Sequence, residues 1–153
     1  MAVTEEKLTG VLSGSAGEYF VAGELCRRGY IASILLNNAG GIDIQCSNRE
    51  TSKTVGIQVK TNKGKTTEWV LNKKIEGFYA DNLFYIFVCL NSNQRFPEFF
   101  VVPSKEVTEF ATVYHQKWLA TPGRKGQAHK DNPMRKFIDK ERRFQNRWDL
   151  LGL

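Results

Sequence analysis

A chain of 153 residues, 41% of them apolar, has the length of one ordinary domain and can bury a hydrophobic core without disulfides or structural metals. Its 22 Lys and Arg residues outnumber its 16 Asp and Glu residues, and the net charge of +6 favours polyanionic partners without identifying one. The longest apolar run, residues 83–90, is far too short to cross a bilayer, so the sequence argues against a membrane-spanning protein.

Three cysteines, Cys26, Cys46 and Cys89, are widely spaced in apolar runs and lack the CxxC or Cys/His spacing of a zinc site. We expect them to be small core residues in a reducing compartment. The N-terminal residues show no basic stretch followed by an apolar segment. We therefore expect a single cytoplasmic domain over residues 1–153.

The first predicted element is a helix over residues 13–28, with Ser13 or Ser15 available as its N-cap and Gly29 placed to end it. A β-branched and apolar run over residues 30–36 follows and predicts the first strand. A turn rich in Asn and Gly then leads into a second strand.

Two short strand-like runs, residues 41–46 and 55–60, carry the most informative polar side chains. Side chains alternate along a strand, so Asp43 projects away from its apolar neighbours, and Gln58 and Lys60 project together. The polar, turn-prone segment between the runs lets them pair as an antiparallel hairpin. A carboxylate, an amide oxygen and an ammonium would then meet, and together they can hold a metal ion beside a phosphate.

The middle of the chain continues with a basic segment, residues 61–74, and a short helix or turn at residues 75–80. The continuous apolar run over residues 83–90 is typical of a central strand buried on both faces. A further strand is expected at residues 99–102.

The C-terminal part predicts two helices separated by a loop. Ser104 is placed to cap a helix that runs to about Leu119, and residues 121–133, rich in Gly, Pro and charge, should form a loop. A last helix is expected over residues 134–150, with Phe137, Phe144 and Trp148 on a rough apolar stripe.

Glu18 in the first predicted helix shares a face with Val21 and Leu25, so its carboxylate should point towards the sheet. A carboxylate that points inward needs a partner. Glu24 differs, because arginines follow it at three and four residues, the spacing of a solvated ion pair. We assign Glu18 to the site and Glu24 to the surface.

Glu18, Asp43, Gln58 and Lys60, in this order and on these elements, resemble the PD-(D/E)xK nuclease superfamily. The resemblance implies an α/β fold with a restriction-endonuclease-like core, a mixed central β-sheet flanked by helices in the order αβββαβ. Glutamine stands where the family usually has glutamate, and in this respect the chain is similar to the Mrr-type branch, whose members act on modified DNA.

The resemblance further implies a metal-dependent DNA endonuclease that uses Mg²⁺ or Mn²⁺. Asp43, Gln58, the Val59 carbonyl and Glu18 would hold the ion, and Lys60 would position the attacking water and the phosphate. A neutral amide adds no charge, so the site has only two carboxylates. The alternative is a catalytically weak or inactive nucleic-acid-binding or interaction protein on the same scaffold.

Taken singly, these residues also fit a structural interpretation, with Asp43 as a polar residue near a turn and Gln58 and Lys60 on the solvated face of an edge hairpin. Phosphate contacts are expected from two basic groups, and for the last helix a solvated face is an equal alternative. Double-strand cleavage would require a homodimer or sequential nicking. The expected DNA-contacting residues are Lys63, Lys65, Lys73, Lys74, Arg142, Arg143 and Arg147.

Overall fold

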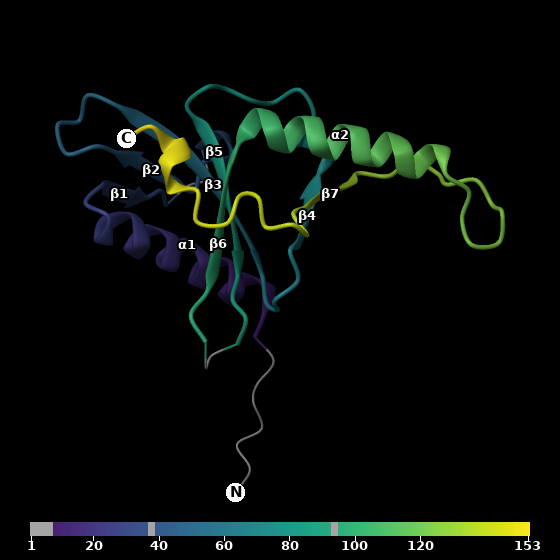
Figure 1. Cartoon of the computed structure of the whole chain (residues 1–153), viewed down its shortest axis with the longest axis horizontal. Helices are drawn as coiled ribbons and strands as arrows, with labels where there is room; N and C mark the ends of the chain where they lie inside the picture. Colours follow the sequence, from purple (N-terminus) through teal and green to yellow (C-terminus); the bar gives the residue numbers. More distant parts are fainter. Residues whose placement is uncertain (1–7, 37–38, 93–94) are drawn as a thin grey trace, which may run out of the picture.

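The computed structural model describes residues 8–36, 39–92 and 95–153, which form a mixed α/β fold around a five-stranded sheet of order β1-β2-β3-β5-β6 (Figure 1). A two-stranded ribbon of β4 and β7 accompanies this sheet. In chain order the elements are α1 (Gly10–Arg27), β1 (Ile31–Ile34), the short 3₁₀ helix η1 (Ala39–Gly41), β2 (Ile44–Ser47), β3 (Thr54–Asn62), β4 (Glu68–Asn72), η2 (Lys73–Ile75), β5 (Leu83–Cys89), β6 (Glu98–Pro103), α2 (Ser104–Ala120), β7 (Met134–Ile138) and η3 (Trp148–Leu151).

The sheet is mixed because β3 and β5 run parallel, whereas the other neighbouring strands run antiparallel. The predicted hairpin is confirmed, with Ile44 of β2 opposite Ile57 of β3. The predicted central strand is also confirmed, since every residue of β5 is buried. A strand in the middle of a sheet covered on both faces needs a continuous apolar run, which is why this element is readable from sequence.

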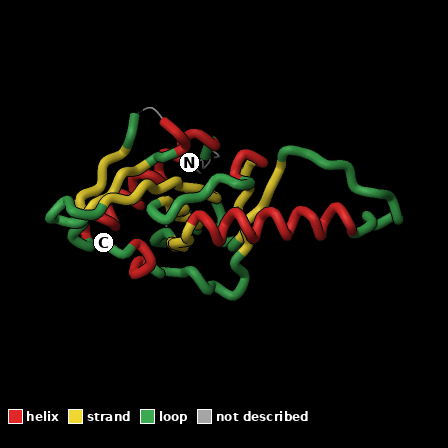
Figure 2. Tube along the Cα trace, turned by 90° about the horizontal axis from the view of Figure 1, so that it is seen from above, coloured by secondary structure: helices red, strands yellow, loops and turns green. Residues whose placement is uncertain are grey.

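Helix α1 covers one face of the sheet, and α2 with the β4–β7 ribbon covers the other (Figures 1 and 2). The core under α1 contains Val21 and Leu25 of the helix together with Ile57 and Ile86 of the sheet. The opposite core is aromatic, and its members include Trp69, Tyr85, Phe87, Phe100 and Phe137.

The prediction of a last helix over residues 134–150 is wrong. Residues 134–138 form β7, and Phe137 lies opposite Trp69 of β4, where both rings join the aromatic core. The chain then continues through turns to η3. The segment predicted as basic, residues 61–74, contains β4 and the end of β3. Strands β4 and β7 pair although they are far apart in the chain, and this pairing overrides the local sequence pattern of both segments.

The ends of the helices differ from the prediction in their capping. Helix α1 begins at Gly10 with Thr9 as its N-cap, and Ser13, buried inside the helix, donates its hydroxyl to the Gly10 carbonyl. Gly29 ends the helix as expected, in a left-handed conformation with φ of 90°. Ser104 is not a cap, because its hydroxyl bonds to the backbone of Ala80.

Two smaller expectations also change. Cys26 is exposed on α1, while Cys46 and Cys89 are buried as predicted. The short helix or turn expected at residues 75–80 is present as the single turn η2 and the turn that follows it, but no α-helix separates β3 from β5, and β4 stands there instead, so the element order αβββαβ is wrong after β3. Within residues 8–36, 39–92 and 95–153, no helix combines the length and the apolar character needed to cross a membrane.

Candidate active site

Asp43 lies immediately before β2 and is held on both sides by the backbone of neighbouring strands. Its amide donates to the Ile57 carbonyl at 2.9 Å, and its carbonyl accepts from the Leu35 amide at 2.9 Å. The left-handed turn through Gly40 and Gly41 brings the chain to this point. The position of the carboxylate is therefore set by backbone hydrogen bonds to β3 and to the end of β1.

The Asp43 carboxylate is buried, with 6% of the residue exposed, and its Oδ2 accepts a hydrogen bond from the Val59 amide at 2.7 Å. Burial raises the pKa of this carboxyl, and the Val59 amide and the charge of Lys60 oppose that rise. The charged form is thus held in a place where it is poorly solvated. A cation at this carboxylate would relieve that cost.

The Val59 backbone lies beside Asp43, and its carbonyl is the oxygen ligand expected from the sequence. A strand residue directs its N–H and its C=O to the same side, and the Val59 N–H is bonded to Asp43. Because β2 begins only at Ile44, no β2 residue pairs with Val59 in the sheet. The Val59 carbonyl is therefore directed into the space beside the carboxylate.

Glu18 reaches the same place from α1. It is half-buried, and its pKa is raised first by burial and then by the neighbouring charge of Asp43, with Lys60 acting in the opposite direction. The structure therefore brings Glu18, Asp43 and Lys60 within electrostatic reach of one another. Glu24 binds Arg27 and Arg28 as predicted, and its side chain is half-buried between them and not fully at the surface.

Gly17 allows α1 to approach β3 at this point. A Cβ atom placed on Gly17 would lie 1.9 Å from the Oγ1 of Thr61, so no larger residue fits without displacement. Thr61 is the neighbour of Lys60 in β3, and Glu18 is the neighbour of Gly17 in α1. The close contact between helix and strand thus brings the Glu18 carboxylate to the site.

Gln58 and Lys60 project from β3 on the face opposite Ile57 and Val59, and both are half-buried. A Cβ atom on Gly41 would lie 3.9 Å from the Nε2 of Gln58, which places the amide beside the turn that leads to Asp43. The structure therefore brings Gln58 to the same end of β2 as the Asp43 carboxylate.

Tyr85 is a site residue that sequence reasoning missed. It aligns with Gln58 in the parallel pairing of β3 and β5, and only 1% of it is exposed. Among the described residues its hydroxyl has no hydrogen-bond partner. Burial, and then the charge of Asp43, raise its pKa to about 12. The alternation of β5 shows on which face Tyr85 lies, but only the strand register reveals its neighbours.

The donors at this place suit a hard divalent cation. Asp43 and Glu18 offer carboxylate oxygens, Gln58 offers an amide oxygen and Val59 a carbonyl, and Mg²⁺ and Mn²⁺ prefer such ligands. The buried, poorly compensated carboxylate supports the same fit. In the described part of the chain, no three His, Cys, Asp or Glu side chains are grouped to hold a metal ion. Among the described residues, an ion here would therefore have at most two anionic ligands from the protein, Asp43 and Glu18.

The predicted DNA-contacting residues are spread over three regions. Lys63 and Lys65 are exposed after β3, and Lys73 and Lys74 are exposed on η2. The three arginines expected on a last helix lie on turns instead. Arg142 binds Glu98, Arg147 binds Asp149, and the Arg143 guanidinium lies 5.3 Å from the centre of the Phe144 ring.

Solved structures share this architecture. Hjc, a Holliday junction resolvase from Archaeoglobus fulgidus, aligns with a TM-score of 0.53 and 13% identity over 91% of this chain and 95% of its own. The bacterial homing endonuclease I-Ssp6803I aligns with a TM-score of 0.52 and 14% identity over 95% of this chain and 94% of its own. No family model and no curated protein sequence matches the chain. The predicted restriction-endonuclease-like fold is confirmed.

Proposed function

We propose that this protein is a metal-dependent DNA endonuclease that hydrolyses phosphodiester bonds. One observation carries the proposal: a buried carboxylate, Asp43, lies at a strand end with Glu18 and Lys60 in electrostatic reach, on the fold of two nucleases. The Asp43 carboxylate accepts from the Val59 amide but forms no ion pair among the described residues, and a buried charge of this kind is costly to stability, so it calls for a ligand that compensates it.

In this proposal the protein oxygens of Asp43, Glu18, Gln58 and Val59 hold Mg²⁺ or Mn²⁺. The bound ion supplies Lewis acidity, which lowers the pKa of water and offsets charge on the phosphate. Asp43 keeps its orientation through the Val59 amide. In hydrolysis, the oxygen of a water molecule bonds to phosphorus and the bond from phosphorus to one sugar oxygen breaks.

Lys60 and Tyr85 would act on the phosphate and the attacking water. Lys60 is a point charge that donates to a phosphate oxygen and orients the water. Tyr85 has a pKa of about 12 and stays neutral, so it donates a hydrogen bond and does not act as a base. Its hydroxyl has no hydrogen-bond partner among the described residues and would donate to a ligand at the site.

Cleavage of supercoiled plasmid in the presence of Mg²⁺ or Mn²⁺ tests the function. Asp43→Asn, Lys60→Ala and Glu18→Gln should each abolish or strongly reduce cleavage, and EDTA should stop it. Glu24→Gln is the matched control, because it removes a carboxylate from the same helix that is bound to Arg27 and Arg28 and not directed at Asp43. Equal cleavage by wild type and Asp43→Asn would overturn the assignment of the site.

The alternative function is a nucleic-acid-binding or interaction protein that keeps the nuclease fold without catalysis. The neutral Gln58 and the pair of carboxylates favour it, because fewer anionic ligands hold a divalent ion more weakly. Calorimetric titration with Mn²⁺ in the absence of DNA separates the two. The nuclease should bind the ion, and Gln58→Glu should tighten binding while Gln58→Ala weakens it.

The names of the structural neighbours suggest which DNA to compare. One acts as a Holliday junction resolvase and the other as a homing endonuclease. We therefore propose that cleavage be compared on a four-way junction and on linear duplexes of the same sequence. Preference for the junction would indicate recognition of DNA structure, and preference for one linear sequence would indicate base readout.

A further inference from the structure

The second half of α2 extends beyond the body of the protein. The helix contributes Val107 and Ala111 to the aromatic core, and after Ala111 only His115 is buried. Residues 112–120 continue the helix for roughly 14 Å at 1.5 Å per residue. Figures 1 and 2 show this part of α2 and the loop that follows it standing out from the sheet. We call residues 112–133 the arm.

The arm is held in a defined shape by its own contacts. The rings of Trp118 and His129 stack at 4.1 Å with an angle of 6° between their planes, and the Nδ1 of His129 lies 2.7 Å from the Trp118 carbonyl oxygen. Nε2 of His115 lies 2.7 Å from Oδ1 of Asp131, which ties the end of the loop back to the helix. These contacts hold the end of α2 and the last residues of the loop side by side.

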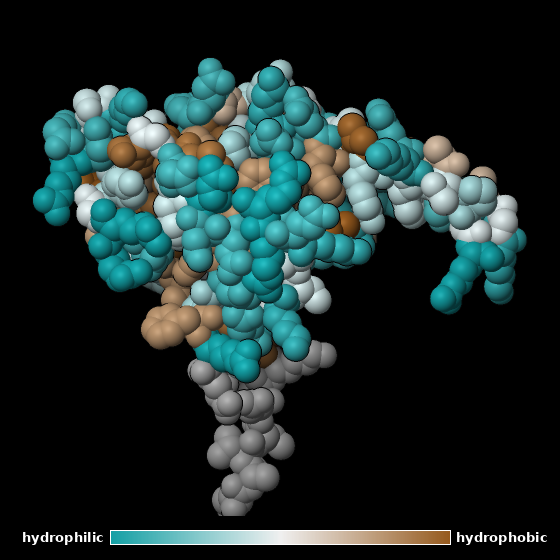
Figure 3. Space-filling view, viewed as in Figure 1, coloured by the Kyte–Doolittle hydropathy of each residue, from teal (hydrophilic) through white to brown (hydrophobic). Residues whose placement is uncertain are grey.

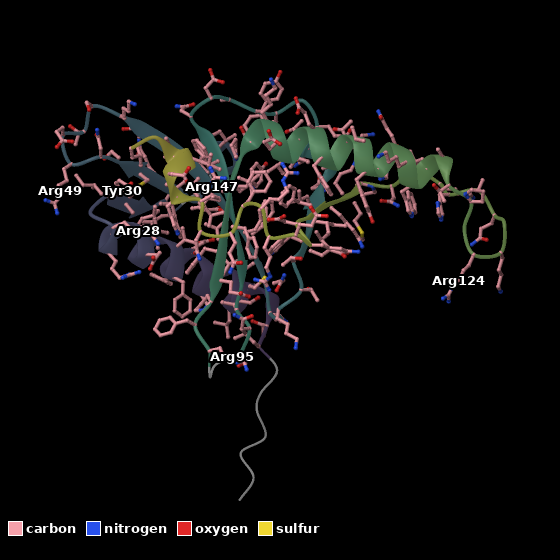
Figure 4. All side chains as sticks on the ribbon, in the orientation of Figure 1. Arg28, Tyr30, Arg49, Arg95, Arg124 and Arg147 are labelled. Carbon is pink, nitrogen blue, oxygen red and sulfur yellow. The ribbon has the colours of Figure 1, made fainter. Side chains whose placement is uncertain are left out.

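The tip of the arm is a closed turn. The Gly123 amide donates to the Gln127 carbonyl and the Gly126 amide to the Gly123 carbonyl, both at 2.8 Å, while Gln127 also accepts from the Lys125 amide. Gly126 has φ of 76°, a conformation that suits glycine. The turn presents Arg124 and Lys125 outward, and Figure 4 shows Arg124 at the far end of the molecule.

The arm is strongly basic: it contains four Lys and Arg residues and one acidic residue. Among the described residues, Lys117, Arg124, Lys125 and Lys130 form no ion pair, whereas the single acidic residue of the arm, Asp131, lies beside His115, Lys73 and Arg135. The surface at the end of the loop is hydrophilic (Figure 3). Unpaired cations on a projecting, shaped element suit a polyanion.

We infer that the arm grips the phosphate backbone of duplex DNA outside the cleavage site, an inference that rests on the proposed function. The tip offers charges without a large apolar side chain, which suits sequence-independent phosphate contacts better than a protein interface. Because the arm stands away from the sheet, its contacts add to those near Asp43. The arm contributes affinity and reach, and it takes no part in the chemical step.

Binding of a fluorescent duplex at several salt concentrations, with EDTA present to prevent cleavage, tests the inference. Changing Arg124 and Lys125 together to Gln should weaken binding equally on unrelated sequences. The slope of log affinity against log salt should become less steep by about 0.9 for each phosphate that the variant no longer neutralises. The matched control changes Arg49 and Lys53 to Gln, which removes the same charge from the β2–β3 turn at the opposite end (Figure 4).

The two proposals fail in different ways. The arm inference fails if the wild type binds duplex DNA and the arm variant keeps the wild-type salt slope. It also fails if the control variant loses as much DNA affinity as the arm variant. In both cases the nuclease proposal stands. If neither the wild type nor the arm variant binds DNA, DNA is not the partner, and both proposals fail. Support requires a shallower slope in the arm variant alone, with unchanged thermal stability and, on plasmid, a raised KM at unchanged kcat.

Discussion

At the scale of single residues, the charges of two carboxylates at the site lower the stability of the fold. Asp43 and Glu18 both have raised pKa values, so the native state binds their protons more tightly than the unfolded chain does. This tighter proton binding adds to the free energy of unfolding. The added stability is fully present at pH values below the ordinary carboxyl pKa, and it is lost as the pH rises through the raised pKa values. At neutral pH the site therefore destabilises the fold when no cation compensates it.

Asp43→Asn should raise the free energy of unfolding at neutral pH and change it little at about pH 4, near the ordinary carboxyl pKa. Asparagine removes the charge but keeps an oxygen that can accept from the Val59 amide. Urea denaturation at both pH values measures the effect. Mn²⁺ should stabilise the wild type and not the variant, since an ion that binds only the native state raises its stability. A variant less stable than wild type at neutral pH would contradict this account.

Tyr85→Phe should leave the fold as stable as wild type or more stable by about 1 kcal/mol, because it removes a buried hydroxyl that has no partner among the described residues. The same change should lower the rate of plasmid cleavage if the hydroxyl donates to the ligand. Thermal denaturation and single-turnover cleavage give the two values. A large drop in stability would show that the hydroxyl has a structural partner, and an unchanged rate would remove Tyr85 from the site.

At the scale of elements, the contact of α1 with β3 decides where Glu18 lies. Alanine usually stabilises a helix relative to glycine by up to about 1 kcal/mol. At Gly17 the added methyl would collide with Thr61, so Gly17→Ala should instead destabilise by about 1–3 kcal/mol, the range for overpacking. It should also weaken Mn²⁺ binding by displacing the Glu18 carboxylate.

Gly14→Ala and Gly23→Ala are the controls for this prediction. Both positions lie in α1, and apart from the adjoining residues and backbone of the helix itself, no described atom lies within 4 Å of a Cβ added at either one. They should stabilise the protein as helix propensity predicts. Adding Thr61→Ala to the Gly17→Ala variant should recover part of the stability and of the ion affinity. Chemical denaturation measures the stability of each variant, and calorimetry measures its affinity for Mn²⁺. Equal stability and equal affinity in the three single alanine variants would rule out the close contact at Gly17.

The elements that local pattern specifies were predictable from sequence, and those specified by distant pairing were not. The hairpin of β2 and β3 and the apolar strand β5 follow from alternation and continuity. They place Asp43 next to the start of β2, although its strand was expected to begin at residue 41, and they place Gln58 and Lys60 on β3. Strand β7 was predicted as helix because its partner, β4, lies far away in the chain. Tyr85 was missed for a similar reason, since its proximity to Gln58 depends on register.

At the scale of the whole molecule, one chain carries one candidate site, and one site cuts one strand. We expect supercoiled plasmid to be nicked first, with linear product following. If two copies act together, the linear fraction should rise more steeply than in proportion to protein concentration. Gel analysis over a dilution series, with sedimentation of the free protein, checks this. Linear product formed without nicked intermediate at the highest dilution would contradict single-strand cleavage by one copy.

The ribbon of β4 and β7 has a consequence for synthesis on the ribosome. Glu68 and Lys136, which bind each other across it, are separated by 68 residues, so β4 emerges long before its partner exists. Until then Trp69 and the aromatic rings of β5 lack the cover that Phe137 later supplies. A growing chain therefore carries an exposed aromatic face through much of its translation, a surface that holdase chaperones recognise. Premature termination before Met134 should yield aggregates and not a smaller folded protein.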